Sequence, residues 1–102
     1  MRVGRVRVEG VSMLPTLRPG DRLLVHWGGR VRPHALVVAR PMARPELLVV
    51  KRARLHLGGD DWDLTADNPD VFGRGWTSGP ATVTGRVLLR YPRWWAPARR
   101  AS

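Results

Sequence analysis

Cysteine is absent from this chain of 102 residues, so structural disulfides, cysteine metal ligands and thiol catalysis are excluded. No apolar run approaches the roughly 18 to 20 residues that a bilayer-spanning helix needs. The N-terminus also lacks the apolar segment of a secretory signal. We therefore expect a cytoplasmic protein without a transmembrane anchor. The three histidines show no ligand spacing, so neither a metal nor another cofactor is expected.

Acidic residues are scarce: eight Asp and Glu stand against 18 Lys and Arg, and the formal net charge is +10. Such a charge favours association with nucleic acid, anionic lipid or an acidic partner. Because the basic residues are scattered along the chain, we predict no stable complex with nucleic acid. Five carboxylates fall between Asp60 and Asp70, but their spacing does not match a calcium-binding loop and is typical of solvated turns.

Lysine is nearly absent as well. Of the 18 basic residues 17 are arginine, and the only lysine is Lys51. A guanidinium stays protonated at any working pH, whereas a buried ammonium can lose its proton and act as a base. Biased codon usage would account for the excess of arginine, but it does not account for the exception. Lys51 is therefore a candidate general base.

The most informative segment that is present runs Gly10-Val11-Ser12-Met13-Leu14-Pro15-Thr16-Leu17-Arg18-Pro19-Gly20-Asp21. Pro15 and Pro19 prevent a regular helix of useful length, so we expect Ser12 to be held on a turn. A serine hydroxyl is a weak nucleophile near neutral pH and requires a base within hydrogen-bonding reach. Ser12 and Lys51 together form a candidate nucleophile and base.

The rest of the chain indicates a single, mostly β domain. Nine prolines and eleven glycines separate short apolar runs, a composition that favours strands and turns over long helices. Segments in which apolar and polar residues alternate, or in which apolar residues are continuous, lie between turn residues. They predict strands at 3–9, 22–27, 35–39, 47–57, 62–65 and 81–90. Pro33 and Pro41 are expected to bound the third of these strands.

Alternation along the fourth predicted strand gives a second reason to single out Lys51. Side chains of a strand alternate between its two faces, so Leu47, Val49, Lys51 and Ala53 share one face. Burial on that apolar face would favour the neutral amine of the lysine. A lysine whose ammonium reaches solvent at a strand end is the competing interpretation.

These segments resemble the signal peptidase I family of Ser/Lys proteases. The family has a Ser-Met-x-Pro-Thr-Leu run followed by Gly-Asp, and a Lys-Arg pair after an apolar run, as in Val49-Val50-Lys51-Arg52. Ala66-Asp67-Asn68 resembles its Gly-Asp-Asn element and Gly85-Arg86-Val87 its final motif, so the resemblance extends from about residue 8 to residue 88. It implies that Ser12 is the nucleophile and Lys51 the base, with these residues supporting the site: Pro15, Asp21, Arg52, Asp67 and Asn68.

The resemblance also implies a fold and a place for two further residues. We expect a coiled, partly closed antiparallel sheet of the signal peptidase/LexA-like type, with a peptidase domain at residues 1–92 and a basic aromatic tail at 93–102. Met13 is expected to line the substrate cleft. Gly10 stands where many members have a side-chain oxyanion donor, so backbone N–H groups near Ser12 would have to stabilise the oxyanion.

One family motif is missing. A Ser-x-Asp-Ser-Arg run, whose first hydroxyl helps to orient the lysine, is replaced here by Val71-Phe72-Gly73-Arg74-Gly75-Trp76. Thr65, Thr77 and Ser78 are the candidates for a substitute hydroxyl, and the sequence does not choose among them.

Within the family, the small size, the missing anchor and the arginine-rich composition resemble the maturation proteases of nickel-type superoxide dismutase. That resemblance implies an endopeptidase that removes the N-terminal propeptide of the dismutase precursor, its protein partner. The alternatives are a processing protease for another substrate and a LexA-like self-cleaving switch, for which only eleven residues precede Ser12. A small basic nucleic-acid-binding barrel is the non-enzymatic alternative.

The predicted tail carries Trp94 and Trp95 among arginines. It would stack on nucleic acid, lie at a membrane surface, or fold back on the domain. None of the family motifs lies in it, so we expect it to be dispensable for the chemistry.

Overall fold

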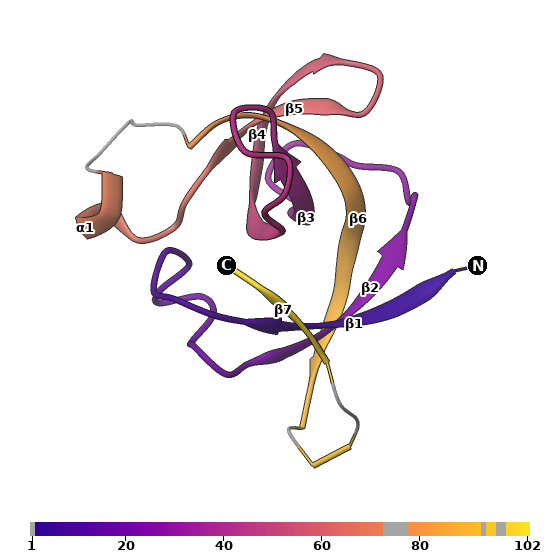
Figure 1. Ribbon diagram of the computed structural model, residues 1–102, viewed down its shortest axis with the longest axis vertical. Helices are drawn as coiled ribbons and strands as arrows, with labels where there is room; N and C mark the ends of the chain where they lie inside the picture. The colour runs from indigo at the N-terminus through magenta and orange to yellow at the C-terminus, as the bar shows by residue number, and fades with distance from the viewer. Residues whose placement is uncertain (1, 73–77, 93, 96–97) are drawn as a thin grey trace.

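The computed structural model describes residues 2–72, 78–92, 94–95 and 98–102. Its elements in chain order are β1 (Val3–Val8), β2 (Arg22–Trp27), β3 (Leu36–Pro41), β4 (Val49–Gly58), β5 (Asp61–Thr65), α1 (Pro69–Phe72), β6 (Gly79–Tyr91) and β7 (Arg99–Ala101). Figure 1 shows the strands wrapped around one another, with α1 to one side. The predicted mostly β fold is confirmed.

The strands form one sheet of order β3-β4-β5-β6-β2-β1-β7. The 13-residue strand β6 pairs with β5 and with β2, and it also pairs with β3, which joins the β3-β4-β5-β6 half of the sheet into a closed unit. Register shifts at Leu24/Val25 and Val38/Ala39 mark irregularities where the strands bend. The sheet is therefore coiled and partly closed, as predicted.

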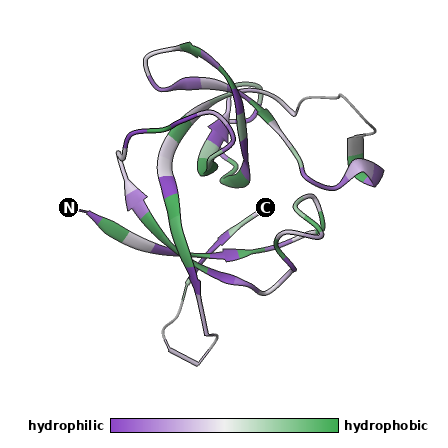
Figure 2. Ribbon diagram, turned by 180° about the vertical axis from the view of Figure 1, so that it is seen from behind, coloured by the Kyte–Doolittle hydropathy of each residue, from purple (hydrophilic) through white to green (hydrophobic). Residues whose placement is uncertain are grey.

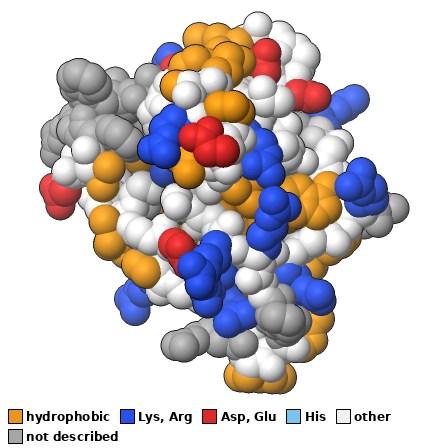
Figure 3. All heavy atoms as spheres, viewed as in Figure 1, with side chains coloured by type: hydrophobic (Ala, Val, Ile, Leu, Met, Phe, Trp, Pro, Cys, Tyr) orange, Lys and Arg blue, Asp and Glu red, His pale blue; other side chains and the backbone are white. Residues whose placement is uncertain are grey.

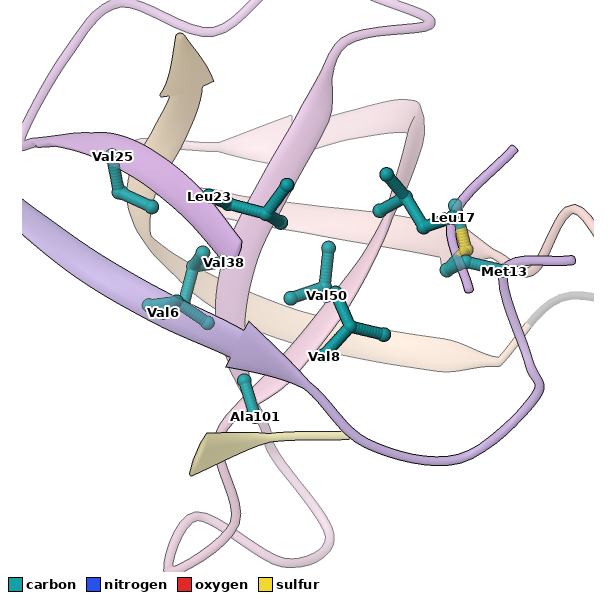
Figure 4. Close-up of a cluster of buried hydrophobic side chains, with 9 residues drawn as sticks. All are labelled: Val6, Val8, Met13, Leu17, Leu23, Val25, Val38, Val50 and Ala101. Carbon is teal, nitrogen blue, oxygen red and sulfur yellow. The ribbon is translucent and has the colours of Figure 1, made fainter. Parts of the chain in front are cut away.

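Two clusters of buried side chains form the core. The first lies between β1, β2 and the nucleophile turn, and Figure 4 shows its members pointing toward one another: Val6, Val8, Met13, Leu17, Leu23, Val25, Val38, Val50 and Ala101. The second fills the closed half of the sheet: Val37, Ala39, Val49, Ala53, Trp62, Leu64, Ala81 and Val83. Figure 2 shows hydrophobic and hydrophilic positions interspersed along the strands, the pattern of strands with one buried face.

One predicted strand boundary is wrong. The sequence places Pro41 outside the third strand, but β3 runs through Pro41, whose Cα partner on β6 is Ala81. Pairing of β3 with β4 ends at Ala39, opposite Val49. Pro41 therefore has a neighbouring strand on one side only, and its missing N–H is tolerated there as it is at a sheet edge.

The C-terminal residues contribute a strand of their own. β7 lies parallel to β1, with Val6 opposite Arg99 and Val8 opposite Ala101, whereas the other strand pairs are antiparallel. Ala101 is 3% exposed and belongs to the first core cluster. These residues fall within the segment that the sequence groups as a tail, and they add an edge to the sheet.

α1, four residues long, is the helix of the described part of the chain. No helix in those residues has the length and apolar character that a bilayer crossing requires.

Candidate active site

Ser12 lies on a turn that follows β1. Gly10 has a φ of +78°, a conformation that side-chain-bearing residues rarely adopt, and it directs the chain out of the strand. The turn is held by hydrogen bonds from Leu14 N–H to the Val11 carbonyl and from Leu17 N–H to the Met13 carbonyl. Ser12 is therefore presented from a compact, hydrogen-bonded loop, as the two prolines predict.

The two ends of this loop are fastened to each other. Val8 N–H donates to the Asp21 carbonyl at 2.8 Å, and Gly20 N–H donates to the Val8 carbonyl at 2.8 Å. The Asp21 carboxylate accepts from Arg18 N–H at 2.9 Å and forms an ion pair with Arg90. Asp21 thus stabilises the base of the loop and leaves Ser12 at its far side.

Lys51 extends from β4 to this turn. Its Nζ lies 2.6 Å from Ser12 Oγ, which accepts a hydrogen bond from it. Lys51 is 7% exposed and sits between Val49 and Ala53, both members of the second core cluster. Burial lowers the pKa of Lys51 below its ordinary value, because the ammonium is poorly solvated there. The strand alternation therefore predicts the buried position of this lysine correctly.

Asp67 links β4 to the nucleophile turn. Arg52 donates to its two carboxylate oxygens through Nε at 3.0 Å and Nη2 at 2.5 Å, and Thr16 Oγ1 donates to Oδ2 at 2.5 Å. Burial opposes ionisation of Asp67, but the hydrogen bonds from Arg52 and Thr16 outweigh it and lower the pKa of the carboxyl group. The same contact with Asp67 raises the pKa of Arg52. The carboxylate is thus charged and fixed near neutral pH.

Asn68 holds the turn directly. Its backbone N–H donates to the Ser12 carbonyl at 2.9 Å, and its side-chain Nδ2 donates to the Val11 carbonyl at 2.9 Å. The side-chain oxygen accepts from Asp70 N–H at the start of α1. Asn68 therefore fixes the backbone on both sides of the serine, while Asp67 fixes Thr16 farther along the same turn.

We expect Asp67→Asn to lower the free energy of unfolding by about 1 to 3 kcal/mol, because it leaves a partly buried guanidinium without its charged partner. The stability that the lowered pKa represents is present above the carboxyl's unfolded pKa and is lost as the pH falls through its folded pKa. Urea unfolding at neutral pH measures the change.

The matched control for that measurement is Asp63→Asn. Asp63, on β5, pairs with Arg54, which lies on β4 like Arg52, but the Arg54 side chain is 48% exposed. Exposed pairs contribute less than about 1 kcal/mol. Equal losses in the two variants would mean that the Arg52–Asp67 contact has no special structural weight.

Met13, which the resemblance places at the substrate cleft, is buried in the structure. Its side chain is 1% exposed and belongs to the first core cluster, in which Figure 4 shows it beside Leu17. A side chain so enclosed does not line an open cleft. In this structure Met13 therefore belongs to the core, and its expected role at the substrate cleft stays a prediction.

Other implied residues have simpler placements. Pro15 follows a cis peptide bond from Leu14 and is exposed on the turn. Of the candidate orienting hydroxyls, Thr65 lies on β5, and its Cα partner on β4 is Arg52. Arg52 is the residue that follows Lys51 in the chain. Ser78 Oγ is buried and has no hydrogen-bond partner among the described residues, and Thr77 lies outside them.

The sequence missed two contributors to this neighbourhood. Thr16 has no predicted role of its own within the serine motif, yet its hydroxyl connects the turn to Asp67. The His34 carbonyl accepts from Arg52 Nη1 at 2.9 Å, a contact without any sequence signal. Both contacts join segments far apart in the chain, where local patterns carry no information.

A large pocket lies elsewhere on the molecule. It has a volume of about 1130 Å³ and is lined by residues that include Arg2, Trp27, Arg30, Arg40, Trp62 and Arg99, but by neither Ser12 nor Lys51. The described residues contain no group of three or more metal-ligating side chains. The Ser12–Lys51 pair is distinguished by its geometry and burial, and this large basic hollow is a separate feature.

Comparison with known proteins identifies the family. A family model described as peptidase S24-like matches residues 2–88, which include Ser12, Lys51, Arg52, Asp67 and Asn68. A search of the curated proteins finds no match. The mostly β fold is consistent with the S24/LexA-like fold, and the match supports a serine peptidase function in general. The chain therefore belongs to the peptidase S24-like family.

Proposed function

We propose that this protein is a serine endopeptidase in which Ser12 is the nucleophile and Lys51 the general base. The observation that carries the proposal is the 2.6 Å separation of Lys51 Nζ and Ser12 Oγ, with the lysine almost completely buried. A Ser-Lys pair is an established variant of the catalytic triad. A buried lysine is suited to it, because desolvation favours the neutral amine that can accept a proton.

The reaction runs in two halves. Neutral Nζ takes the proton of Ser12 Oγ as Oγ forms a bond to the substrate carbonyl carbon. The tetrahedral intermediate then collapses, the C–N bond breaks, and the Lys51 ammonium returns its proton to the leaving amine. Water next attacks the acyl-enzyme ester, giving its proton to Nζ. Nζ passes that proton to Ser12 Oγ as the acid product leaves.

Backbone N–H groups stabilise the oxyanion in this proposal. Gly10 supplies no side chain, so a side-chain donor at that position is not available. Asn68 donates hydrogen bonds to the carbonyls of Val11 and Ser12. These bonds fix the two peptide units whose N–H groups belong to Ser12 and Met13. Donors fixed before the reaction stabilise a developing charge without reorganisation.

Activity is expected to rise with pH. Below its pKa Lys51 is an ammonium and cannot accept the serine proton, so cleavage is lost in acid and grows as Lys51 deprotonates. Because burial lowers this pKa, the rise should lie below the ordinary lysine value of 10.5. The pH dependence of kcat/KM reports the free enzyme. A rate that is constant or falls across this range, while tryptophan fluorescence shows a folded protein, would contradict Lys51 as base.

The substrate that we propose is the precursor of nickel-type superoxide dismutase, from which the N-terminal propeptide would be removed. Support comes from the resemblance of the Ser12 and Lys51 motifs and of the arginine-rich composition to that group of proteases. Incubation with the precursor, followed by mass spectrometry of the new N-terminus, tests the proposal. One defined cleavage at the propeptide junction is expected. An uncut precursor, with a general peptide substrate still cleaved, would assign the enzyme to another protein substrate.

A further inference from the structure

β7 continues into a position between the two segments that carry the catalytic pair. On one side it pairs with β1, and Glu9 N–H donates to the Ala101 carbonyl at 2.6 Å. On the other side Ser102 N–H donates to the Leu48 carbonyl at 2.9 Å, and Val50 N–H donates to the Ser102 carbonyl at 2.6 Å. Residues 99–102 thus form backbone hydrogen bonds to β1 and to the start of β4 at once. We name the place they occupy the β7 position.

Both neighbours of the β7 position lead to the reacting groups. β1 continues through a few residues to Ser12, and the residue after Val50 is Lys51. The N–H and the carbonyl of Ser102 bond to the residues before and after Val49, which is the hydrogen-bond pattern of parallel strands. β7 is also parallel to β1. An extended peptide in this position that was one or two residues longer would therefore place its next carbonyl at the Ser12–Lys51 pair.

We propose that residues 99–102 occupy the strand position through which a peptide substrate reaches Ser12, so that this segment competes with substrate from within the chain. The inference rests on the proposed function of Ser12 and Lys51. Adding an extended peptide to an open strand edge is a general mode of peptide recognition, with affinity from main-chain hydrogen bonds. Here the main-chain groups of Leu48, Val50 and Glu9, which such a peptide would need, are bonded to the chain's own residues.

The contacts of the segment are those of a strand that can be displaced. Ala101 is buried against the first core cluster, as Figure 4 shows, whereas Arg99, Arg100 and Ser102 are exposed. The Arg100 side chain is 76% exposed, and its ion pair with Glu9 is correspondingly weak. Arg99 lines the large pocket, as do Arg2 and Arg40, and Figure 3 shows Lys and Arg side chains spread over the face of the molecule that it draws. Figures 1 and 2 show β7 as a short strand whose C-terminal end lies beside the nucleophile turn.

A reversible cross-link tests this inference in the full chain. Arg7 and Arg100 are Cα partners on β1 and β7, and both carry exposed or partly exposed side chains. Neighbouring strands lie about 4.7 to 4.9 Å apart, within the range that a disulfide bridges. Because the chain has no cysteine, Arg7→Cys combined with Arg100→Cys gives one defined disulfide.

We expect the oxidised double variant to cleave the dismutase precursor at least about tenfold more slowly than the reduced one, because locking the segment removes the open fraction to which substrate binds. Dithiothreitol should restore the rate. The Arg7→Cys single variant, given the same oxidant and reductant, is the control and should not respond. Equal and measurable rates of cleavage in the oxidised and reduced double variant would overturn the inference.

A second test compares a variant that loosens residues 99–102 with a matched control. Ser102→Pro removes the N–H that donates to Leu48, whereas Ser102→Ala keeps it. Ser102→Pro should lower KM severalfold with kcat unchanged, and Ser102→Ala should behave as wild type. If residues 99–102 had only a structural role, Ser102→Pro would instead lower kcat or leave KM unchanged, and either result would contradict the inference.

A binding measurement separates this inference from the proposed function. In the Ser12→Ala background, a fluorescein-labelled Ala-Arg-Arg-Ala-Ser peptide, which repeats residues 98–102, should bind the Ser102→Pro protein at least about tenfold more tightly than the oxidised double-cysteine protein. Loss of cleavage in every variant with this difference retained would reject the proposed function alone. Equal binding, including none in either protein, would reject the β7 position as a displaceable peptide site.

Discussion

Ser12→Ala is expected to abolish peptide cleavage while leaving the fold intact. Oγ supplies the bond-forming atom of the reaction, and removing the nucleophile of a serine protease typically costs about 10⁶ in kcat. The hydroxyl itself contributes little packing, because Ser12 lies on a half-buried turn whose backbone is held by Asn68 and by its own hydrogen bonds. Circular dichroism and a cooperative unfolding transition should therefore match those of the wild type.

Ser102→Ala is the matched control for that experiment, since it removes a serine hydroxyl from an exposed position and keeps the backbone hydrogen bonds. Wild type and variant should be purified separately, so that traces of wild-type enzyme do not account for the low residual rate of the variant. A Ser12→Ala protein that still cleaves at the wild-type rate would remove Ser12 from the mechanism.

The pairing of Ser12 with Lys51 could be predicted from the sequence because the signals were local and unusual. Lys51 is the single lysine in an arginine-rich chain, and strand alternation places it on an apolar face. Ser12 lies in a segment whose prolines exclude a helix. Those two facts, with the family resemblance, were sufficient to expect the contact that the structure has at 2.6 Å.

The way in which the supporting residues act could not be predicted. A motif points to Asp67 and Asn68, but their contacts with Thr16 and Val11 join positions 51 and 57 residues apart. Such contacts depend on how the coiled sheet brings segments together, which periodicity does not report. Met13 shows the same limit, because a residue on a turn has no alternation to indicate the face that it buries.

The C-terminal strand is a further case. Residues 99–101 read Arg-Arg-Ala, with no alternation and no β-branched side chain, so nothing local predicts a strand. Its pairing arises because β1 and the residues before Lys51 leave unpaired main-chain groups that it satisfies. Tertiary context therefore decides its structure.

Lys51→Arg is expected to be nearly as inactive as Lys51→Ala, although it keeps the positive charge. A general base must lose and regain a proton, and a guanidinium holds its proton throughout the working pH range. General-base contributions are typically of order 10² to 10⁴ in rate, so the loss should be at least about a hundredfold. Raising the pH should not rescue the variant, whereas the wild type gains activity as Lys51 deprotonates.

Arg52→Lys is the control for arginine and lysine exchange on the same strand. It keeps the charge beside Asp67 and loses the two-pronged contact, so its effect should fall mainly on stability. An electrostatic or nucleic-acid-binding role for Lys51 makes a different prediction, namely that arginine substitutes for lysine at position 51 with little loss.

The most direct test of the Ser12–Lys51 mechanism is the rate at which Lys51→Arg cleaves a peptide substrate, measured beside wild type and Lys51→Ala at the pH where the wild type is most active. The mechanism predicts that Lys51→Arg falls at least about a hundredfold below wild type and close to Lys51→Ala. A Lys51→Arg protein that cleaves within about tenfold of wild type, well short of that loss, would contradict it, because an arginine cannot be the base.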